Sequence, residues 1–265
     1  MARAAAAAAL WMATACLLFV AGFVRGATCP PPNFSTVENF NLTRRVHIAA
    51  LRASPRLCAH LGACESRSYI SRPWYSLQQA VTSYQPRDSF YCVRAEYRRS
   101  PNDASRLLVF NQGRKGGVSG PLQGGAQFLL NAVVRDEARG KLAVGPPFLH
   151  TSTYGPYWVV AAGPSQGGPY DWAVISGGPP TQQGANGTCT NTRSGTPGVG
   201  AGEGLWLFSR EPTPQGGLLA QLRGVAADKG FDLSVLFPVE QSGCSYVPFP
   251  AATQQAPPPF GGFSG

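Results

Sequence analysis

Few residues in this chain have types and spacings that could support catalysis or metal binding. It holds three histidines and thirteen carboxylates, a small supply for acid/base work. The spacing Cys58-x-His60-x-x-x-Cys64 offers metal-ligating types, and the glycine-rich run 198–204 superficially suggests a nucleotide loop. That run lacks the Gly-x-Gly-x-x-Gly spacing and leads into a predicted strand rather than a helix. Neither Gly-x-Ser-x-Gly nor His-Glu-x-x-His occurs. We therefore expect no enzyme activity, no metal and no cofactor.

The N-terminus has the pattern of a secretory signal peptide. Arg3 precedes an apolar stretch that continues to Val24, and small residues follow near Gly26. We expect cleavage after residue 26. The alternative is a retained signal anchor, because about 20 apolar residues can span a bilayer.

Cysteine and glycosylation patterns indicate the same compartment. Six cysteines remain after cleavage, and an even number in a secreted chain indicates disulfides, with the pairing left open. In an oxidising compartment a local disulfide is a better use of two nearby sulfurs than a metal site. Three glycosylation sequons begin at Asn33, Asn41 and Asn186. We predict a secreted glycoprotein, with an organelle lumen as the alternative. The cysteines are Cys29, Cys58, Cys64, Cys92, Cys189 and Cys244.

The charge is positive but dispersed. Cleavage removes Arg3 and Arg25, so the formal charge falls from +9 to +7. A nucleic-acid binder would gather this charge on one face beside stacking aromatics, and the basic residues here are scattered. We expect no nucleic-acid partner, and at most weak association with acidic membrane surfaces. The oligomeric state stays open.

From Tyr69 onward the pattern is typical of β-structure. Short segments of alternating or continuous apolar character are separated by Gly, Pro, Asn and Asp. Eight such strands in series form either a sandwich or a closed up-and-down barrel. The predicted strands are 74–81, 90–97, 106–111, 126–134, 141–144, 157–162, 171–176 and 204–210.

The remaining segments are assigned around these strands. One helix follows them, with Thr213 as N-cap, Pro214 in the first turn and Gly230 as the stop. Its apolar face carries Leu218, Leu222 and Val225. Segment 231–239 is a candidate final strand, and 177–204 is a long loop. Residues 27–68 form an N-terminal extension with a small helical insert at 44–66, residues 69–246 form the barrel, and residues 247–265 form a disordered Pro/Gly-rich tail.

Three separated patches resemble the lipocalin family, in that family's order. The likeness is closest to the apolipoprotein D group and to bacterial outer-membrane lipocalins. Two departures are Arg72, where the family has Gly, and a long insertion between Leu42 and Tyr69. The patches are Glu38-Asn39-Phe40-Asn41-Leu42 with Tyr69-Ile70-Ser71-Arg72-Pro73-Trp74-Tyr75; Gly155-Pro156-Tyr157-Trp158-Val159-Val160 with Tyr170-Asp171-Trp172-Ala173-Val174; and Leu205-Trp206-Leu207-Phe208-Ser209-Arg210-Glu211-Pro212 with Gly230-Phe231-Asp232.

The resemblance implies an all-β fold, an eight-stranded antiparallel up-and-down lipocalin barrel with one C-terminal α-helix packed outside. It implies that Trp74 plugs the closed end and that Arg210 lies across it as a structural cation–π partner. It also implies the pairings Cys29–Cys189 and Cys92–Cys244, which leaves Cys58 with Cys64.

The function implied is a carrier of a small hydrophobic ligand inside the barrel, since eight strands can enclose one small molecule. Fatty acids, sterols and retinoid- or carotenoid-like terpenoids all suit such a cavity. One alternative is an enzyme on the same fold, related to xanthophyll de-epoxidases. The other is an interaction module with a filled barrel. The candidate ligand-binding residues are Tyr91, Val93, Ala95, Tyr97, Leu107, Val109, Phe128, Leu142 and Tyr157.

Overall fold

The computed structural model describes residues 28–43, 69–70, 72–103, 105–124, 129–164, 170–191 and 202–250. The predicted signal peptide, the helical insert with its Cys58–Cys64 pair, and residues 251–265 of the tail lie outside the described residues. Phe128 does so as well.

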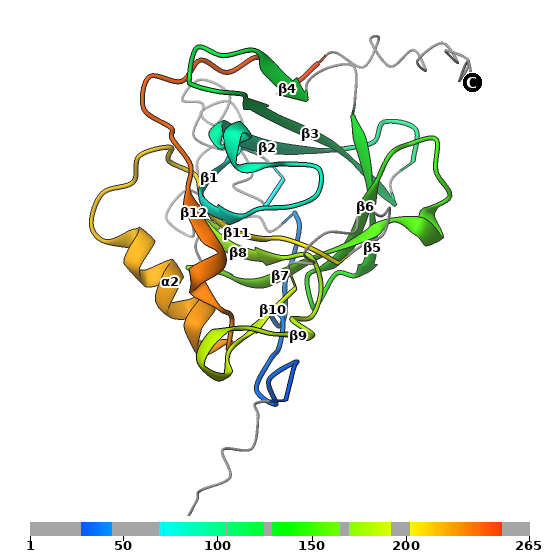
Figure 1. Cartoon of the computed structure of the whole chain (residues 1–265). Helices are drawn as coiled ribbons and strands as arrows, with labels where there is room; N and C mark the ends of the chain where they lie inside the picture. Colours follow the sequence, from blue (N-terminus) through cyan, green and yellow to red (C-terminus); the bar gives the residue numbers. More distant parts are fainter. Residues whose placement is uncertain are drawn as a thin grey trace, which may run out of the picture.

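Eight antiparallel strands form a closed ring (Figure 1). Each pairs with its neighbour in the chain, and β11 returns to pair with β1, with Tyr75 opposite Ser209. The predicted fold class is thereby confirmed. The barrel strands are β1 (Trp74–Ala80), β2 (Tyr91–Arg99), β3 (Arg106–Arg114), β5 (Leu130–Asp136), β6 (Lys141–Gly145), β7 (Gly155–Gly163), β8 (Trp172–Ser176) and β11 (Leu205–Ser209).

Alternation along each strand separates the lumen from the outer face. On β3, Leu107 and Val109 belong to the interior cluster, whereas Leu108 and Phe110 belong to a separate outer cluster. This is the period-two geometry of a strand that is buried on both faces. Successive strands of the meander run in opposite directions, so alternate connections lie at the same end of the barrel. The connections β1–β2, β3–β5, β6–β7 and β8–β11 lie at the end here called the mouth.

A bulge interrupts the alternation predicted for 90–97. Tyr91 pairs with Arg114 and Arg94 pairs with Gln112, so β2 carries one extra residue at this point. Cys92 takes a positive φ of 55° within the bulge. The extra residue changes which side chains face inward at the start of β2.

The helix starts later than predicted. Helix α2 spans Leu218–Asp228, so Thr213 is not its N-cap and Pro214 is not in its first turn. Gly216 and Gly217 have φ of 74° and 79°, and a right-handed helix cannot continue through such values. Its apolar face packs on the outside of β8 and β11, as predicted. Gly230 ends it at a φ of 79°.

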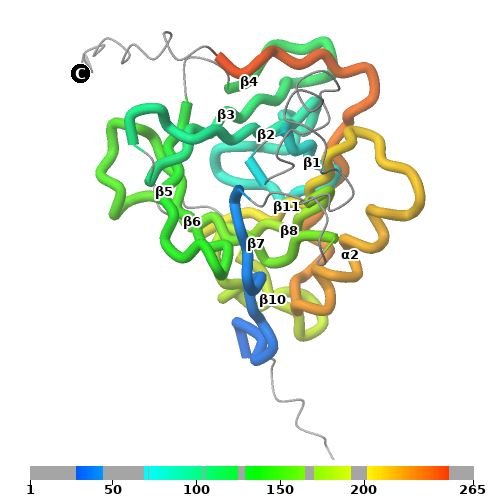
Figure 2. Tube along the Cα trace, turned by 180° about the vertical axis from the view of Figure 1, so that it is seen from behind, coloured from blue at the N-terminus to red at the C-terminus, as the bar shows by residue number. Residues whose placement is uncertain are grey.

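The N-terminal segment 28–43 runs beside β7 and closes the end opposite the mouth (Figure 2). The Val37 amide donates to the Val159 carbonyl at 3.1 Å, and the Phe40 amide donates to the Ala138 carbonyl at 2.9 Å. Phe40 packs into the interior cluster together with Leu42. Burial of each such side chain contributes about 1.5–3 kcal/mol.

The C-terminal segment covers the outer face of β2 and β3. Gln112 on β3 bonds both main-chain groups of Val247, at 3.1 and 3.0 Å, and Phe249 packs edge-on against Phe110. The chain therefore remains packed against the barrel beyond residue 246, where the barrel was predicted to end. Short strand β4 (Leu122–Gly124) pairs with β3, and β12 (Leu236–Pro238) pairs with β1.

Segment 231–239 forms less strand than predicted. The Asp232 carboxylate accepts from the Ser234 amide at 2.8 Å and begins a 3-10 turn, Leu233–Val235, before β12. A side chain that bonds nearby main-chain amides competes with strand pairing in this way.

Two disulfides join the ends of the chain to the barrel. Cys29 is bonded to Cys189 on β10 (Cys189–Thr190), which pairs with β9 (Gln182–Gln183) inside the long 177–204 loop. Cys92 on β2 is bonded to Cys244. These are the two pairings that the resemblance implied. No helix among the described residues is long and apolar enough to cross a membrane.

We expect the Cys92–Cys244 bond to contribute strongly to stability, because its partners are 152 residues apart in the sequence. In the chain-entropy model, a loop of that length is worth about 4–5 kcal/mol. The double variant Cys92→Ser/Cys244→Ser should lose most of this free energy of unfolding in a urea titration followed by circular dichroism. An unchanged unfolding midpoint would contradict the prediction.

Candidate functional site

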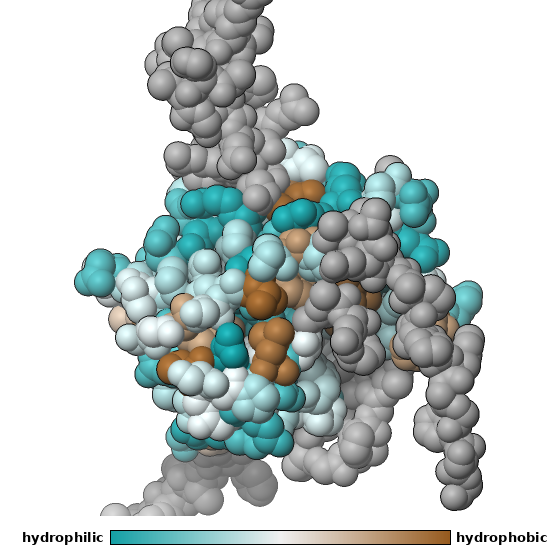
Figure 3. Space-filling view, turned by 90° about the horizontal axis from the view of Figure 1, so that it is seen from above, coloured by the Kyte–Doolittle hydropathy of each residue, from teal (hydrophilic) through white to brown (hydrophobic). Residues whose placement is uncertain are grey.

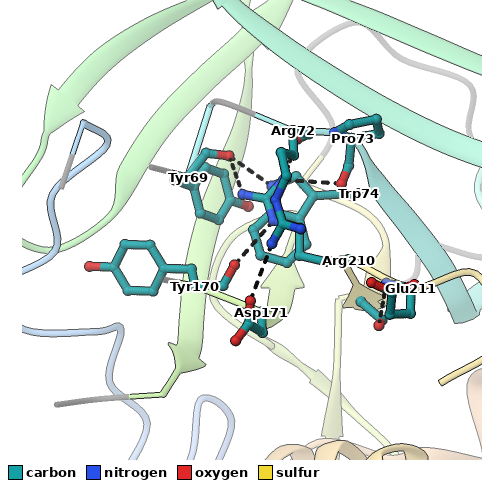
Figure 4. Close-up of polar contacts among 9 residues, drawn as sticks. Tyr69, Arg72, Pro73, Trp74, Tyr170, Asp171, Arg210 and Glu211 are labelled. Carbon is teal, nitrogen blue, oxygen red and sulfur yellow. Dashed lines mark hydrogen bonds and ion pairs between the residues drawn. The ribbon is translucent and has the colours of Figure 1, made fainter. Parts of the chain in front are cut away.

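The closed end of the barrel is built around Trp74 and Arg210 (Figure 4). The Arg210 guanidinium lies 3.5 Å from the centroid of the Trp74 ring, and Trp74 is fully buried. This is the contact that the resemblance implied. A desolvated cation–π pair of this kind is worth about 1–2 kcal/mol.

Main-chain carbonyls take up the Arg210 donors. Nε donates to Tyr170 O at 3.1 Å and Nη2 donates to Tyr69 O at 2.9 Å. Nη1 donates to Pro73 O at 3.0 Å and also to Arg72 O. Burial lowers the pKa of the guanidinium, which nevertheless remains protonated at neutral pH. The residue therefore serves the barrel floor.

Arg72, the departure from the family pattern, is accommodated at the surface. Its side chain is 38% exposed and pairs with Asp171 at 3.3 Å, while its carbonyl accepts from Arg210. The position therefore accommodates a side chain larger than glycine, which reaches Asp171 (Figure 4).

The interior cluster contains most of the predicted ligand-binding residues. Ala95, Tyr97, Leu107, Val109 and Leu142 are buried members, and Tyr157 packs against them while remaining half-buried. These six predicted residues are thus brought together in one lumen, from strands β2, β3, β6 and β7.

Two predicted residues lie apart from that cluster. Val93 packs with Phe90 and Val239 in a separate group near the β1–β2 connection. Tyr91, at the start of β2, belongs to none of the hydrophobic clusters formed by the described residues. The bulge at Cys92 accounts for Tyr91, because an added residue breaks the alternation on which the prediction relied.

Three tyrosines form a hydroxyl cluster inside the barrel. The Tyr97 hydroxyl donates to that of Tyr157 at 2.8 Å, and the hydroxyls of Tyr69 and Tyr157 are 2.7 Å apart. Burial, the largest cause in each case, raises the pKa of all three phenols. All three are therefore protonated at neutral pH.

Sequence reasoning assigned no ligand-facing role to Tyr69. It precedes β1, where strand alternation gives no information about side-chain direction. Its ring packs 4.9 Å from that of Trp74, and the Trp74 indole donates to its carbonyl at 2.9 Å. The presence of two aromatic residues, Tyr69 and Trp74, close together in the sequence was the signal that could have indicated this role.

The β1–β2 connection, the cyan segment in Figure 1, lies across the space that the strands enclose. It carries a tight turn at Thr82–Gln85, closed by main-chain bonds of 3.3 Å in both directions. The buried Glu203 carboxylate, just before β11, accepts from the Ser83 amide at 2.9 Å and from the Ser83 hydroxyl. Buried Gln79 donates to Gln85 at 2.8 Å.

Tyr84 lies in the same turn. Its surface is 67% accessible to water, yet desolvation by the surrounding protein, followed by the charge of Glu203, raises its pKa. The charge of Tyr84 also raises the pKa of Tyr97.

No cluster of three or more potential metal ligands occurs in the part of the chain that the structure describes.

Replacing Arg210 should destabilise the protein far more than replacing Arg72. Arg210→Met leaves buried carbonyls without donors, at about 1–3 kcal/mol each before relaxation, and removes the stack on Trp74. We expect a loss of at least about 3 kcal/mol in denaturant unfolding. Arg72→Met breaks a half-exposed ion pair, worth at most about 1 kcal/mol. Equal losses in the two variants would refute this description of the floor.

The hydroxyl cluster should make the protein sensitive to alkali. An unfolded tyrosine ionises near pH 10, whereas these phenols have raised pKa values in the folded state. Their contribution is complete below about pH 10 and is lost as the pH rises further. In an absorbance titration at alkaline pH, we expect Tyr69, Tyr97 and Tyr157 to be among those of the nine tyrosines that ionise only when the protein unfolds. Ionisation of all nine without loss of the folded circular dichroism signal would contradict this.

The comparisons with known proteins found similar structures but no similar sequence. No family model and no curated protein sequence matches the chain. Lobster apocrustacyanin A1 is 13% identical with a TM-score of 0.43, over 80% of this chain and 93% of that one. Insecticyanin from the tobacco hornworm Manduca sexta is 14% identical with a TM-score of 0.43, over 83% and 94%. Siderocalin Q83 is 13% identical with a TM-score of 0.41, over 66% and 92%.

The fold is identified by the features of the chain itself. The eight strands follow a closed meander, a single helix packs outside β8 and β11, and the N-terminal segment closes one end. At that end Arg210 lies over Trp74, at the positions where the sequence motifs placed them. The chain therefore has the lipocalin fold.

Proposed function

We propose that the barrel binds and carries a small hydrophobic molecule in its lumen, rather than catalysing a reaction. The observation that supports this most directly is the incomplete burial of inward-facing side chains. Leu130, Val144 and Trp206 pack against the interior cluster, yet each retains accessible surface. Asn111, inward by its pairing with Ala95, is exposed. A filled barrel would cover these side chains completely.

The mouth offers an apolar rim. In the described parts of the chain, the exposed large apolar side chains are Tyr84, Leu122 and Phe148. They belong to the β1–β2, β3–β5 and β6–β7 connections, all of which lie at the mouth. Seen from the side of β3 and β4, the surface is otherwise mostly hydrophilic, with small apolar patches (Figure 3). Apolar residues gathered at an entrance favour the passage of an apolar guest.

The free energies permit useful affinity. Burying a 16-carbon chain would contribute about 13 kcal/mol at about 0.8 kcal/mol per methylene. Association and ordering cost about 4–15 kcal/mol, so the balance reaches micromolar binding or tighter for a well-fitted guest.

We further propose that the protein acts outside the cytosol as a secreted glycoprotein. Two disulfides fit an oxidising compartment. The sequon residues Asn33, Asn41 and Asn186 are all exposed, so a glycan at any of them would extend into solvent. Weak attraction to acidic membranes remains an expectation from the net charge.

The first experiment is to express the protein with its disulfides intact, extract it with organic solvent and analyse the extract by mass spectrometry. The same preparation is titrated with a fluorescent fatty acid and with a retinoid. A stoichiometric bound lipid, or saturable quenching of tryptophan fluorescence, is the expected result. A folded protein that shows neither would overturn the carrier proposal and favour an interaction module with a filled barrel.

A matched pair of variants locates the binding space. Val144 on β6 faces the lumen, whereas Val133 on β5, opposite Ala143, lies at an outward position. Val144→Trp should fill lumen volume and weaken binding at least about tenfold, because a bulky ring excludes the guest. Val133→Trp adds the same side chain outside and should leave binding unchanged. If the outward variant loses as much affinity as the inward one, the ligand does not occupy the lumen.

A further inference from the structure

Tyr97 and Tyr157 meet across the barrel. Around the ring, β2 and β7 are four strands apart in either direction, so they form opposite walls. Their rings lie with centroids 5.8 Å apart, and their hydroxyls are joined at 2.8 Å. Tyr69 joins the pair from the closed end, where it packs on Trp74. The three hydroxyls therefore form a polar floor beneath the part of the lumen that opens toward the mouth.

The hydroxyl cluster has one more donor than it uses. Three phenols carry three O–H protons, and the two hydrogen bonds within the cluster use two of them. Among the described residues, no acceptor outside the cluster bonds any of these hydroxyls. One O–H proton is left to be donated to something else.

The exposure of the three residues favours Tyr157 as the one whose hydroxyl offers that proton to the lumen. Tyr69 is 1% exposed and Tyr97 is 3% exposed, whereas Tyr157 is half-buried. A donor without a partner is costly where it is fully desolvated, so the favoured arrangement has Tyr69 and Tyr97 both donating to Tyr157. The Tyr157 oxygen then accepts twice, and its own proton is free for a guest. Hydrogen bonds received in this way polarise the O–H group and strengthen its donation.

The surroundings disfavour a charged guest group. From the tyrosine pair toward the mouth, the polar side chains at inward positions of the described strands are Ser76, Gln79 and Asn111, and none is Lys, Arg or His. Arg210 lies on the far side of the floor, stacked on Trp74 and bonded to main-chain carbonyls. A carboxylate at this depth would be desolvated without a directly paired cation, which costs several kcal/mol.

We propose that the Tyr157 hydroxyl, oriented by Tyr69 and Tyr97, donates a hydrogen bond to an uncharged oxygen at the inner end of the ligand. The barrel thereby selects apolar molecules that end in a hydroxyl or carbonyl group over those that end in a carboxylate. This inference deepens the proposed carrier function and rests on it.

The test compares retinol, retinal and retinoic acid, which share one apolar skeleton and differ in the terminal group. Their dissociation constants at neutral pH are measured by quenching of tryptophan fluorescence. Retinol and retinal should bind at least about tenfold more tightly than retinoic acid, since the carboxylate loses its hydration without gaining a cation. Retinoic acid binding as tightly as retinol would overturn the inference while leaving the carrier function intact. Absence of quenching by all three, and by a fluorescent fatty acid, would overturn both proposals.

Variants assign the selectivity to the hydroxyl cluster. Tyr157→Phe keeps the ring and removes the donor, so retinol should bind about 3- to 10-fold more weakly while retinoic acid changes little. Tyr91→Phe is the matched control, because Tyr91 lies outside the interior cluster, and its affinities should equal those of the wild type. Tyr97→Phe keeps the Tyr157 hydroxyl but removes one orienting donor, and should weaken retinol by about 2- to 3-fold. Unchanged retinol affinity in a folded Tyr157→Phe or Tyr97→Phe variant would refute the assignment.

Discussion

The Arg210 guanidinium is the contact on which the rest of the barrel depends. It follows directly on β11, the last barrel strand, and bonds carbonyls of the segment that leads into β1, so it joins the two strands whose pairing closes the ring. A single charged group satisfies several buried acceptors while its flat face covers Trp74. Such a planar fork of donors suits this task, and the point charge of a lysine does not.

Above the closed floor, the polarity and burial of the lumen change with depth. The Trp74 ring and the inserted Phe40 and Leu42 fill the end completely, and the tyrosine hydroxyls form the next layer. Beyond them the walls are apolar and only partly covered, up to the exposed rim at the mouth. The order from floor to rim therefore runs from a desolvated structural core, through neutral hydrogen-bond donors, to apolar surface. A ligand entering this space meets its first specific polar partner at the deepest accessible point.

The segments that cover the barrel are attached to it by disulfides at some points and by hydrogen bonds at others. Disulfides fasten the N-terminal segment to β10 and the C-terminal segment to β2. Glu203 fastens the turn that carries Tyr84 across the mouth. Because these attachments lie outside the strand ladder, the walls and the mouth are stabilised by different interactions, and the mouth loops can differ in mobility from the walls.

The sequence by itself determined the strand series, which follows from local signals, namely alternation and turn residues, that do not depend on distant contacts. The closed barrel and the Trp74–Arg210 pair at its floor were implied by the resemblance to a known family. Alternation also brought Ala95, Tyr97 and Leu107 to the lumen correctly. It failed at Tyr91, where the bulge at Cys92 changes the phase. The capping residues predicted the helix start too early, because two glycines take left-handed φ before Leu218. Only the tertiary structure could decide that Tyr69, Tyr97 and Tyr157 share one hydroxyl cluster. They come from a loop and from opposite walls, and such a meeting depends on barrel closure, which no local sequence pattern encodes.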